Sequence, residues 1–285
     1  MPFSKKNQAA KQDFTENMLP VNRRQMFFDC IKQRFDIIFK CGLVLLIFIL
    51  PLLIVDYWGN LAYADLVSDT EASDVAGTAA AMQQMVVLIK IPCYVILGIG
   101  FAAISRILRQ LVWAEHIFFF EHLKLGITQN CKSFLVIFLI YGILNAINTF
   151  VSTAFAGSFF SVIPPAISLF IFIPVGLYML SQSIIYNVTF VKSFKNGLTL
   201  YLKTAPFVWI FVALIFALTL TDGIGILLVK IPVHLVIILF VIPMFSIAWI
   251  LYSFHVFDKY VNPENHPEII GKGLYRPIKS EIKSE

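Results

Sequence analysis

Long apolar runs alternate with short polar segments along the chain, and this pattern predicts a helical membrane protein. A helix needs about 20 apolar residues to cross a hydrocarbon core of about 30 Å. Residues within the runs do not alternate between apolar and polar, as the strands of a membrane barrel would. We therefore expect an all-α membrane protein with six transmembrane helices. The six runs cover residues 37–55, 85–104, 134–155, 159–185, 205–221 and 231–257.

The distribution of Lys and Arg predicts the orientation of these helices. All but two of the 22 basic residues fall in the terminal segments or in the second and fourth connections. The exceptions, Lys90 and Lys230, lie at the opposite ends of helices two and six. Segment 57–81 after helix one carries acidic residues and no basic one. Because basic loops stay in the cytosol, we expect both termini on the cytosolic side of a bacterial plasma membrane. We also expect a long loop at 57–81 on the outer side.

The composition agrees with a lipid environment. Hydrophobic residues make up 59% of the chain and charged residues 14%, whereas a soluble domain carries roughly a quarter charged residues. The net charge of +5 is explained by basic flanks that contact anionic lipid headgroups at roughly 1 kcal/mol each. The sequence lacks a concentrated basic face with base-stacking groups, so we expect no nucleic-acid partner.

The domain organisation follows from the same pattern. We expect a cytosolic N-terminal tail at 1–25, one six-helix domain at 26–258 and a cytosolic C-terminal tail at 259–285. The first apolar run begins almost 40 residues into the chain, as in an anchor rather than a cleaved signal peptide. The cysteines lack the spacing of a zinc site and are expected to be reduced thiols. They are Cys30, Cys41, Cys93 and Cys131.

Pairs of lysines reveal an internal repeat. Before helices one, three and five, a lysine follows an apolar residue, and a second lysine follows eight positions later. Eight positions are about two helical turns. We expect each pair to lie on a cytosolic or interfacial helix and to contact anionic lipid or a partner. The pairs are Lys32 and Lys40, Lys124 and Lys132, and Lys195 and Lys203.

The dipeptide Ile-Pro is a second landmark of the repeat. Three copies, at residues 91–92, 163–164 and 231–232, lie at the expected first turns of helices two, four and six. The two landmarks define three units, each an interfacial helix followed by two transmembrane helices. Units with an even number of crossings have parallel orientation, so we expect a pseudo-threefold axis along the membrane normal. The units cover residues 26–110, 119–187 and 190–258.

Prolines and glycines near mid-membrane are candidate hinges. Pro174 and Pro243 lie deep in helices four and six, and Gly98 and Gly100 occupy the corresponding depth in helix two. Internal prolines predict kinks. The kinked backbone either lines a cavity or serves packing alone.

Four polar side chains are expected within the membrane, where such groups are candidates for function. Lys90 fits a lysine that extends to the outer headgroups, with Asp56 as a partner. Asn145 and Asn148 fit interhelical hydrogen bonds or solute coordination, and His234 fits the outer interface. The motifs HExxH, GxSxG and the P-loop are absent. We therefore expect no enzyme activity, no cofactor and no metal site.

Residues 98–135 combine a Gly-containing helix that ends in basic residues with a Phe-rich segment and a Gly-Ile-x-x-Asn-x-Lys pattern. This combination resembles the YesL-like family of small bacterial membrane proteins and, more broadly, YciC-like six-helix proteins. The chain lacks the Thr-x-Gly-Pro that often follows the family's Leu-Pro, present here at residues 50–51. The matching residues are Phe119, Phe120, Leu123, Lys124, Gly126, Ile127, Asn130, Lys132 and Phe134.

The resemblance implies a binding partner and does not imply a catalysed reaction. Members of the family are often associated with carbohydrate ABC importers, so it implies an accessory component of carbohydrate import that contacts importer subunits and lipid. The alternative hypothesis is a small solute transporter or channel with a path among the kinked helices.

Overall fold

The computed structural model describes residues 19–69, 72–186, 188–224 and 226–275, and within these ranges every regular element is a helix. Six helices are long and apolar enough to cross a membrane, by length and composition. This result confirms the predicted multi-pass helical architecture. The spans are Phe35–Leu66, Gly77–Val112, Phe119–Ala154, Phe159–Ile185, Phe190–Thr219 and Leu228–Tyr260.

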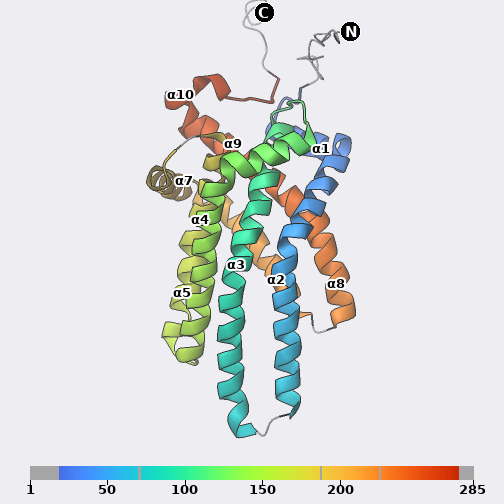
Figure 1. Ribbon diagram of the computed structural model, residues 1–285. Coiled ribbons are helices and arrows are strands. Elements are labelled where there is room, and N and C mark those ends of the chain that lie inside the picture. The colour runs from blue at the N-terminus through green and yellow to red at the C-terminus, as the bar shows by residue number, and fades with distance from the viewer. Residues whose placement is uncertain (1–18, 70–71, 187, 225, 276–285) are drawn as a thin grey trace, which may run out of the picture.

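The elements follow one another in six passes along the bundle (Figure 1). The first half contains α1 (Arg23–Gln33), α2 (Phe35–Asp69), α3 (Ala72–Val112) and α4 (Phe119–Ala154). The fourth pass is built from η2 (Phe159–Ser161), α5 (Ile163–Ile167), η3 (Ser168–Phe172) and α6 (Ile173–Ile185). The last two passes contain α7 (Phe190–Thr219), η4 (Leu220–Gly223), α8 (Leu227–Val236), η5 (Ile237–Val241) and α9 (Ile242–Tyr260). The short elements α10 (Asn262–Asn265) and η6 (Pro267–Ile269) follow.

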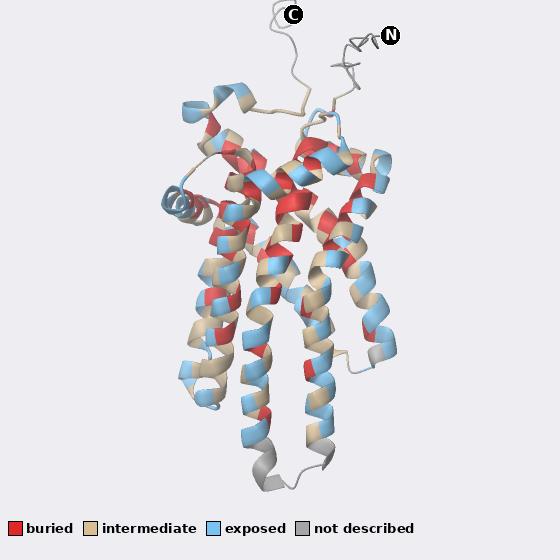
Figure 2. Ribbon diagram, viewed as in Figure 1, coloured by how far each residue is buried: buried red, intermediate tan, exposed pale blue. Residues whose placement is uncertain are grey.

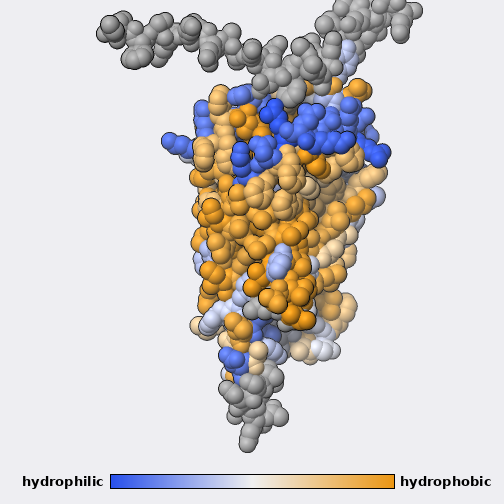
Figure 3. All heavy atoms as spheres, turned by 90° about the vertical axis from the view of Figure 1, so that its right-hand side faces the viewer, coloured by the Kyte–Doolittle hydropathy of each residue, from blue (hydrophilic) through white to orange (hydrophobic). Residues whose placement is uncertain are grey.

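One end of the bundle carries α1, the starts of α4 and α7 and the end of α9, and we call it the basic end. Both ends of the described chain lie here, since the Tyr275 N–H donates to the Pro20 carbonyl at 3.0 Å. Figure 3 shows hydrophilic residues gathered at the basic end and a broad hydrophobic belt beside them. Buried residues are concentrated in the half of the bundle nearest this end (Figure 2).

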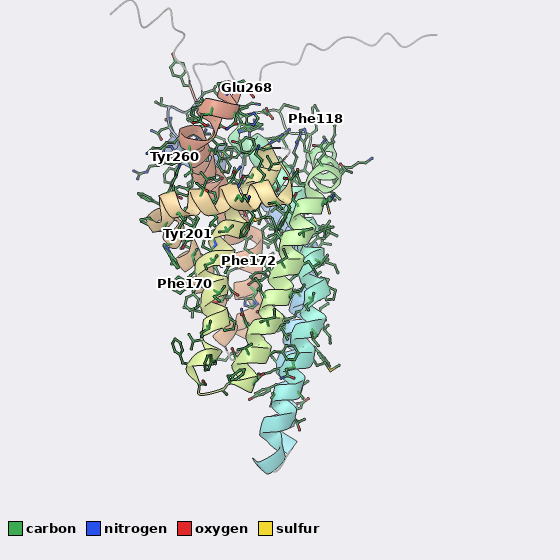
Figure 4. The ribbon with its side chains drawn as sticks, turned by 90° about the vertical axis from the view of Figure 1, so that its left-hand side faces the viewer. Phe118, Phe170, Phe172, Tyr201, Tyr260 and Glu268 are labelled. Carbon is green, nitrogen blue, oxygen red and sulfur yellow. The ribbon has the colours of Figure 1, made fainter. Side chains whose placement is uncertain are left out.

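The segments predicted as interfacial helices take two forms. Helix α1 is separate from α2, because the backbone of Arg34 leaves the helical region, with φ −130° and ψ 31°. The other two are the first turns of α4 and α7, which continue into the membrane-length helices. In Figure 1 the start of α4 crosses the top of the bundle and the start of α7 is seen nearly end-on. In Figure 4 the stretch of α7 near Tyr201 runs across the other helices.

The predicted long loop at 57–81 is wrong. Helix α2 continues to Asp69 and α3 begins at Ala72, so Pro92 lies inside α3 and not in its first turn. The segment is rich in Ala, which is the strongest helix former. An ion pair between Asp56 and Lys90 joins the two helices. Together α2 and α3 form a hairpin that reaches beyond the other helices (Figure 1).

Small residues allow each of α2, α4 and α7 to approach a neighbouring helix closely. Gly42, Gly126 and Gly197 each face the backbone of the helix beside them, where a side chain would collide. Close backbone approach at small residues is a common basis of helix packing in membranes. An added Cβ would lie 2.2 Å from the Leu239 carbonyl oxygen at Gly42, 2.6 Å from that of Ala103 at Gly126, and 3.2 Å from that of Val175 at Gly197.

We predict that Gly42→Ala and Gly126→Ala each destabilise the fold by about 1–3 kcal/mol, because a methyl group would force two backbones apart. The control is Gly77→Ala, since nothing lies within 4 Å of an added Cβ there. This variant should be neutral or slightly stabilising in its helix. Thermal unfolding of the detergent-purified proteins gives the comparison. Equal stability of all three variants would contradict the close approach.

Candidate functional site at the basic end

A partly buried ion pair connects the two ends of the described chain. The guanidinium of Arg23, at the start of α1, lies 2.8 Å from the carboxylate of Asp258 in the last turns of α9. Their side chains are 13% and 18% exposed. Arg23 also donates to the Lys272 carbonyl at 3.1 Å. Helix α1 is thereby tied both to α9 and to the segment that follows it.

Asp258 accepts two further hydrogen bonds. The side-chain amide of Asn262 donates to it at 2.7 Å, and the backbone N–H of Gly271 donates at 3.1 Å. A charge that is largely withdrawn from water needs such partners, because desolvation penalises an unpaired carboxylate strongly. The carboxylate is therefore the point at which α1, α9 and residues 262–272 meet.

The segment after α9 folds back over the end of α3. Gly271 and Gly273 adopt positive φ values of 63° and 84°, which glycine tolerates without strain. At Gly273 an added Cβ would lie 2.3 Å from the Val112 carbonyl oxygen. Between the two glycines, the Lys272 ammonium lies 2.6 Å from a Glu115 oxygen and 4.0 Å from the centre of the Trp113 ring. Residues 259–275, predicted as the first part of a tail, thus pack on the bundle.

Arg109, near the end of α3, is a second basic residue that connects helices at the basic end. Its side chain is buried, lies 4.5 Å from the centre of the Trp113 ring, and donates to the Ile184 carbonyl at 2.8 Å. That carbonyl belongs to the last turn of α6, where backbone oxygens have no partner within the helix. Arg109 therefore joins α3 to α6, in addition to any effect of its charge on orientation.

A stacked pair of rings extends the cluster toward α10. The Tyr186 hydroxyl donates to the side-chain oxygen of Asn262, and its ring stacks on His266 with centroids 5.0 Å apart. Burial, with a smaller effect from the charge of Asp258, raises the pKa of Tyr186. The hydroxyl thus stays protonated and remains a donor at neutral pH.

A cavity of about 210 Å³ lies beside this cluster, between the start of α7 and the end of α9. Polar and cationic side chains from both helices line it, together with a few aliphatic ones. The lining consists of Tyr186, Val188, Lys192, Asn196, Thr199, Leu200, Lys203, Tyr260, Val261, Asn265 and His266.

The six lysines predicted as lipid or partner contacts are all exposed. Lys40 forms an i,i+4 ion pair with Asp36 at 3.2 Å, and Lys203 lies 5.0 Å from the centre of the Tyr260 ring. Of the six, Lys203 lines the cavity. The lysines are spread over α1, α2, α4 and α7 and form a broad basic surface instead of one binding site.

The two candidate hinge prolines each follow a π-helical turn. The Ile173 N–H donates to the Ser168 carbonyl just before Pro174, and the Ile242 N–H donates to the Ile237 carbonyl just before Pro243. Widening the turn accommodates a residue that has no N–H and whose ring would collide with the i−4 carbonyl. In the fourth and the sixth pass, a π-helical turn therefore accommodates the proline that follows it.

The glycines predicted at the corresponding depth of α3 make room for aromatic rings. An added Cβ at Gly98 would lie 3.1 Å from Phe138, and one at Gly100 would lie 2.6 Å from Phe48. The turn around them is α-helical. Their place in the structure is accounted for by packing against α4 and α2.

The predicted intramembrane polar residues connect neighbouring helices. Asn145 donates to the Tyr94 hydroxyl at 3.5 Å, and the side-chain amide of Asn148 lies 3.1 Å from the Ser168 hydroxyl. These bonds link α4 to α3 and to η3. Lys90 pairs with Asp56, the partner that the sequence indicated.

His234 links three elements at the end opposite the basic end. Its Nδ1 lies 3.0 Å from the Tyr57 hydroxyl of α2, and its Nε2 lies 3.3 Å from the Thr221 hydroxyl of η4. Both ring nitrogens therefore take part in contacts that hold α8 in place.

The four cysteines are free thiols in the structure. Cys30, Cys41 and Cys93 are buried free thiols and Cys131 is half-buried. Burial raises the pKa of Cys30 to about 12, so its nucleophilic thiolate form is rare at neutral pH. No group of three or more His, Cys, Asp or Glu side chains that could hold a metal ion occurs among the residues the structure describes.

Comparison with protein-family models, with curated proteins and with solved structures finds no match to this chain.

Sequence reasoning missed the cluster around Asp258. It assigned Arg23 and Arg109 to membrane orientation, and it treated Asp258 as the end of the last helix. One signal was present, since Gly271 and Gly273 flank Lys272 and paired glycines favour a tight turn. The partner of that turn could not be read from the sequence, because Arg23 and Asp258 are 235 positions apart.

We predict that Arg23→Gln and Asp258→Asn each lower the free energy of unfolding by about 1–3 kcal/mol, because each leaves a partly buried charge unpaired. The double variant should lose less than the sum of the two single losses. Lys40→Gln is the control, since its pair with Asp36 is exposed and should contribute about 0.3–0.5 kcal/mol. Strictly additive losses would show that the pair does not stabilise the fold.

Proposed function

We propose that this protein is a non-enzymatic component of a membrane assembly and that its basic end is the contact surface. One observation carries the proposal. The six paired lysines are exposed on the outside of the basic end, whereas Arg23 and Asp258 pair with each other and Arg109 donates to the Ile184 carbonyl of α6. Charges that are exposed together at the edge of a bundle are free to meet an acidic partner or anionic headgroups.

The proposed orientation places the basic end in the cytosol of a bacterium. The support is the charge asymmetry of the sequence, since 20 of the 22 Lys and Arg residues fall in the segments predicted as cytosolic and residues 57–81 carry acidic residues and no basic one. Loops rich in Lys and Arg stay on the cytosolic side. Both termini would then be cytosolic, and the hairpin would project from the outer surface of the plasma membrane.

The proposed partner class is a carbohydrate ABC importer. Its support is the resemblance of residues 98–135 to the YesL-like family. These residues include the end of α3 and the first turns of α4, so the resembling segment forms part of the proposed contact surface. An accessory protein of this kind would position or stabilise the importer and would not itself carry solute.

A solute path is the second proposal, favoured by the two π-helical turns. Such turns are frequent at functional sites, and here they occupy corresponding places in the fourth and sixth passes. In this alternative, α6 and α9 would move relative to the segments before Pro174 and Pro243.

We also propose that the chain consists of three parallel units around a pseudo-threefold axis. Three observations support it. Each outgoing helix meets the returning helix beside it at a glycine, through Gly42, Gly126 and Gly197. Two returning passes share a π-helical turn, which precedes Pro174 in one and Pro243 in the other. Each outgoing helix is preceded by, or begins with, an interfacial segment that carries a lysine pair.

The proposed function is tested by photo-crosslinking in cells. A photoreactive residue replaces the exposed Lys124 or Lys132 of α4, and the control replaces Leu139, exposed in the apolar part of the same helix. We expect importer subunits to be captured from the two lysine positions and not from position 139. Capture of lipid or of this chain alone from all three positions would contradict association through the basic end.

A further inference from the structure

We propose that the cavity between α7 and the end of α9 binds the phosphate of an anionic membrane lipid. This site is distinct from the general contact of exposed lysines with headgroups. It also does not depend on the proposed importer, because the ligand is part of the bilayer itself.

The basic side chains that line the cavity favour an anionic ligand. Lys192 and Lys203 line it from α7, and His266 lines it from the segment after α10. None of the lining residues in the described chain is acidic. Two carboxylates lie just behind the lining: Glu268 is 3.5 Å from the Nδ1 of His266 and has a side chain that is 67% exposed, and Asp258 acts on Tyr186 but is paired with Arg23. An anion at this place would meet at least two positive charges and no carboxylate within the cavity.

The neutral groups of the cavity suit a phosphate. Asn196 and Thr199 lie one turn apart on α7, and Asn265 faces them from α10. The Thr199 hydroxyl already donates to the Lys195 carbonyl at 3.0 Å, and the Asn265 amide donates one hydrogen to the Val261 carbonyl at 3.1 Å. The Asn196 amide and the second hydrogen of the Asn265 amide therefore supply donors for phosphate oxygens, and lysine ammonium groups supply the balancing charge. The volume of about 210 Å³ is below the range of roughly 300–1,000 Å³ that is usual for drug-sized ligands. It therefore fits a headgroup better than a whole ligand.

Aromatic rings hold the cationic groups in place. The Lys203 ammonium lies 5.0 Å from the centre of the Tyr260 ring, and the Lys259 ammonium lies 5.2 Å from the same centre. The ring of His266 is stacked on Tyr186. Cation–π contacts and stacking restrict these side chains, so a bound phosphate would require less ordering of the site.

The position of the cavity distinguishes a lipid from a free phosphate. The first turns of α7 run across the bundle below Tyr260 and above Phe170 and Phe172 (Figure 4). The same turns also expose apolar side chains, at positions that lie between the cavity-lining residues in the sequence of α7. A helix with one polar and one apolar face that crosses a bundle in this way lies in the headgroup region. The exposed apolar residues are Phe190, Val191, Phe194 and Leu202.

The aliphatic residues that line the cavity also favour a lipid over a free phosphate. Val188, Leu200 and Val261 lie among the polar groups of the cavity. A soluble phosphate has no apolar part to cover them, whereas the glycerol and first acyl carbons of a lipid would.

The chain offers a matched control for the test. Lys124 and Lys132 form an equally exposed pair on α4, eight residues apart, and do not line the cavity. The full-length protein is purified in phosphatidylcholine-containing micelles, and phosphatidylglycerol is titrated while bound lipid is counted by native mass spectrometry. The variants are Lys192→Gln/Lys203→Gln, its charge-conserving counterpart Lys192→Arg/Lys203→Arg, and the control Lys124→Gln/Lys132→Gln.

We expect one retained phosphatidylglycerol whose affinity falls about tenfold or more in Lys192→Gln/Lys203→Gln. The Arg variant and the α4 control should stay near wild type. Soluble glycerol 3-phosphate should not displace the lipid. Equal binding by both Gln variants and wild type, or equal loss in both, would overturn the site. Displacement by glycerol 3-phosphate at the same concentration would overturn the lipid as its ligand. Because the replaced lysines are exposed, all variants should keep the wild-type unfolding temperature.

Discussion

The structure of the basic end depends on the withdrawal of the Asp258 carboxylate from water. A carboxylate in that position must be paired and hydrogen-bonded, because its desolvation is otherwise costly. Its partners come from three separate stretches of the chain, namely Arg23, Asn262 and Gly271. Satisfying this one charge therefore brings the first helix, the last membrane-length helix and the segment after it to one place.

The packing around Asp258 leaves the basic residues in two different environments. Arg23 and Arg109 are used inside the fold, where they hold helix ends together. The paired lysines remain on the outside and are available to lipid or to a partner. At the start of α7 two exposed lysines line a cavity, because α7 crosses the bundle there and the segment after α9 forms the opposite wall. The functional proposals rest on this division of the charges.

The six membrane-length helices could be predicted because hydrocarbon thickness fixes both their length and their composition. The polar connections were less predictable. Residues 57–81 are polar enough for a loop, yet they extend α2 and α3, since helix propensity and pairing within the hairpin decide their structure. The Asp258 cluster required knowledge of which distant residue would supply its cation. The pairing of Lys90 with Asp56 was easier, because both lie near the same end of adjacent helices.

Amide hydrogen exchange of residues 262–274 tests most directly whether Asp258 organises the basic end. In the wild-type protein these amides should be protected, because the segment is packed on α1, α3 and α9. In Asp258→Asn they should exchange about tenfold faster or more, while Asp36→Asn, which alters an exposed carboxylate, should leave them unchanged. Rapid exchange in the wild type, or the same protection in Asp258→Asn, would contradict the account.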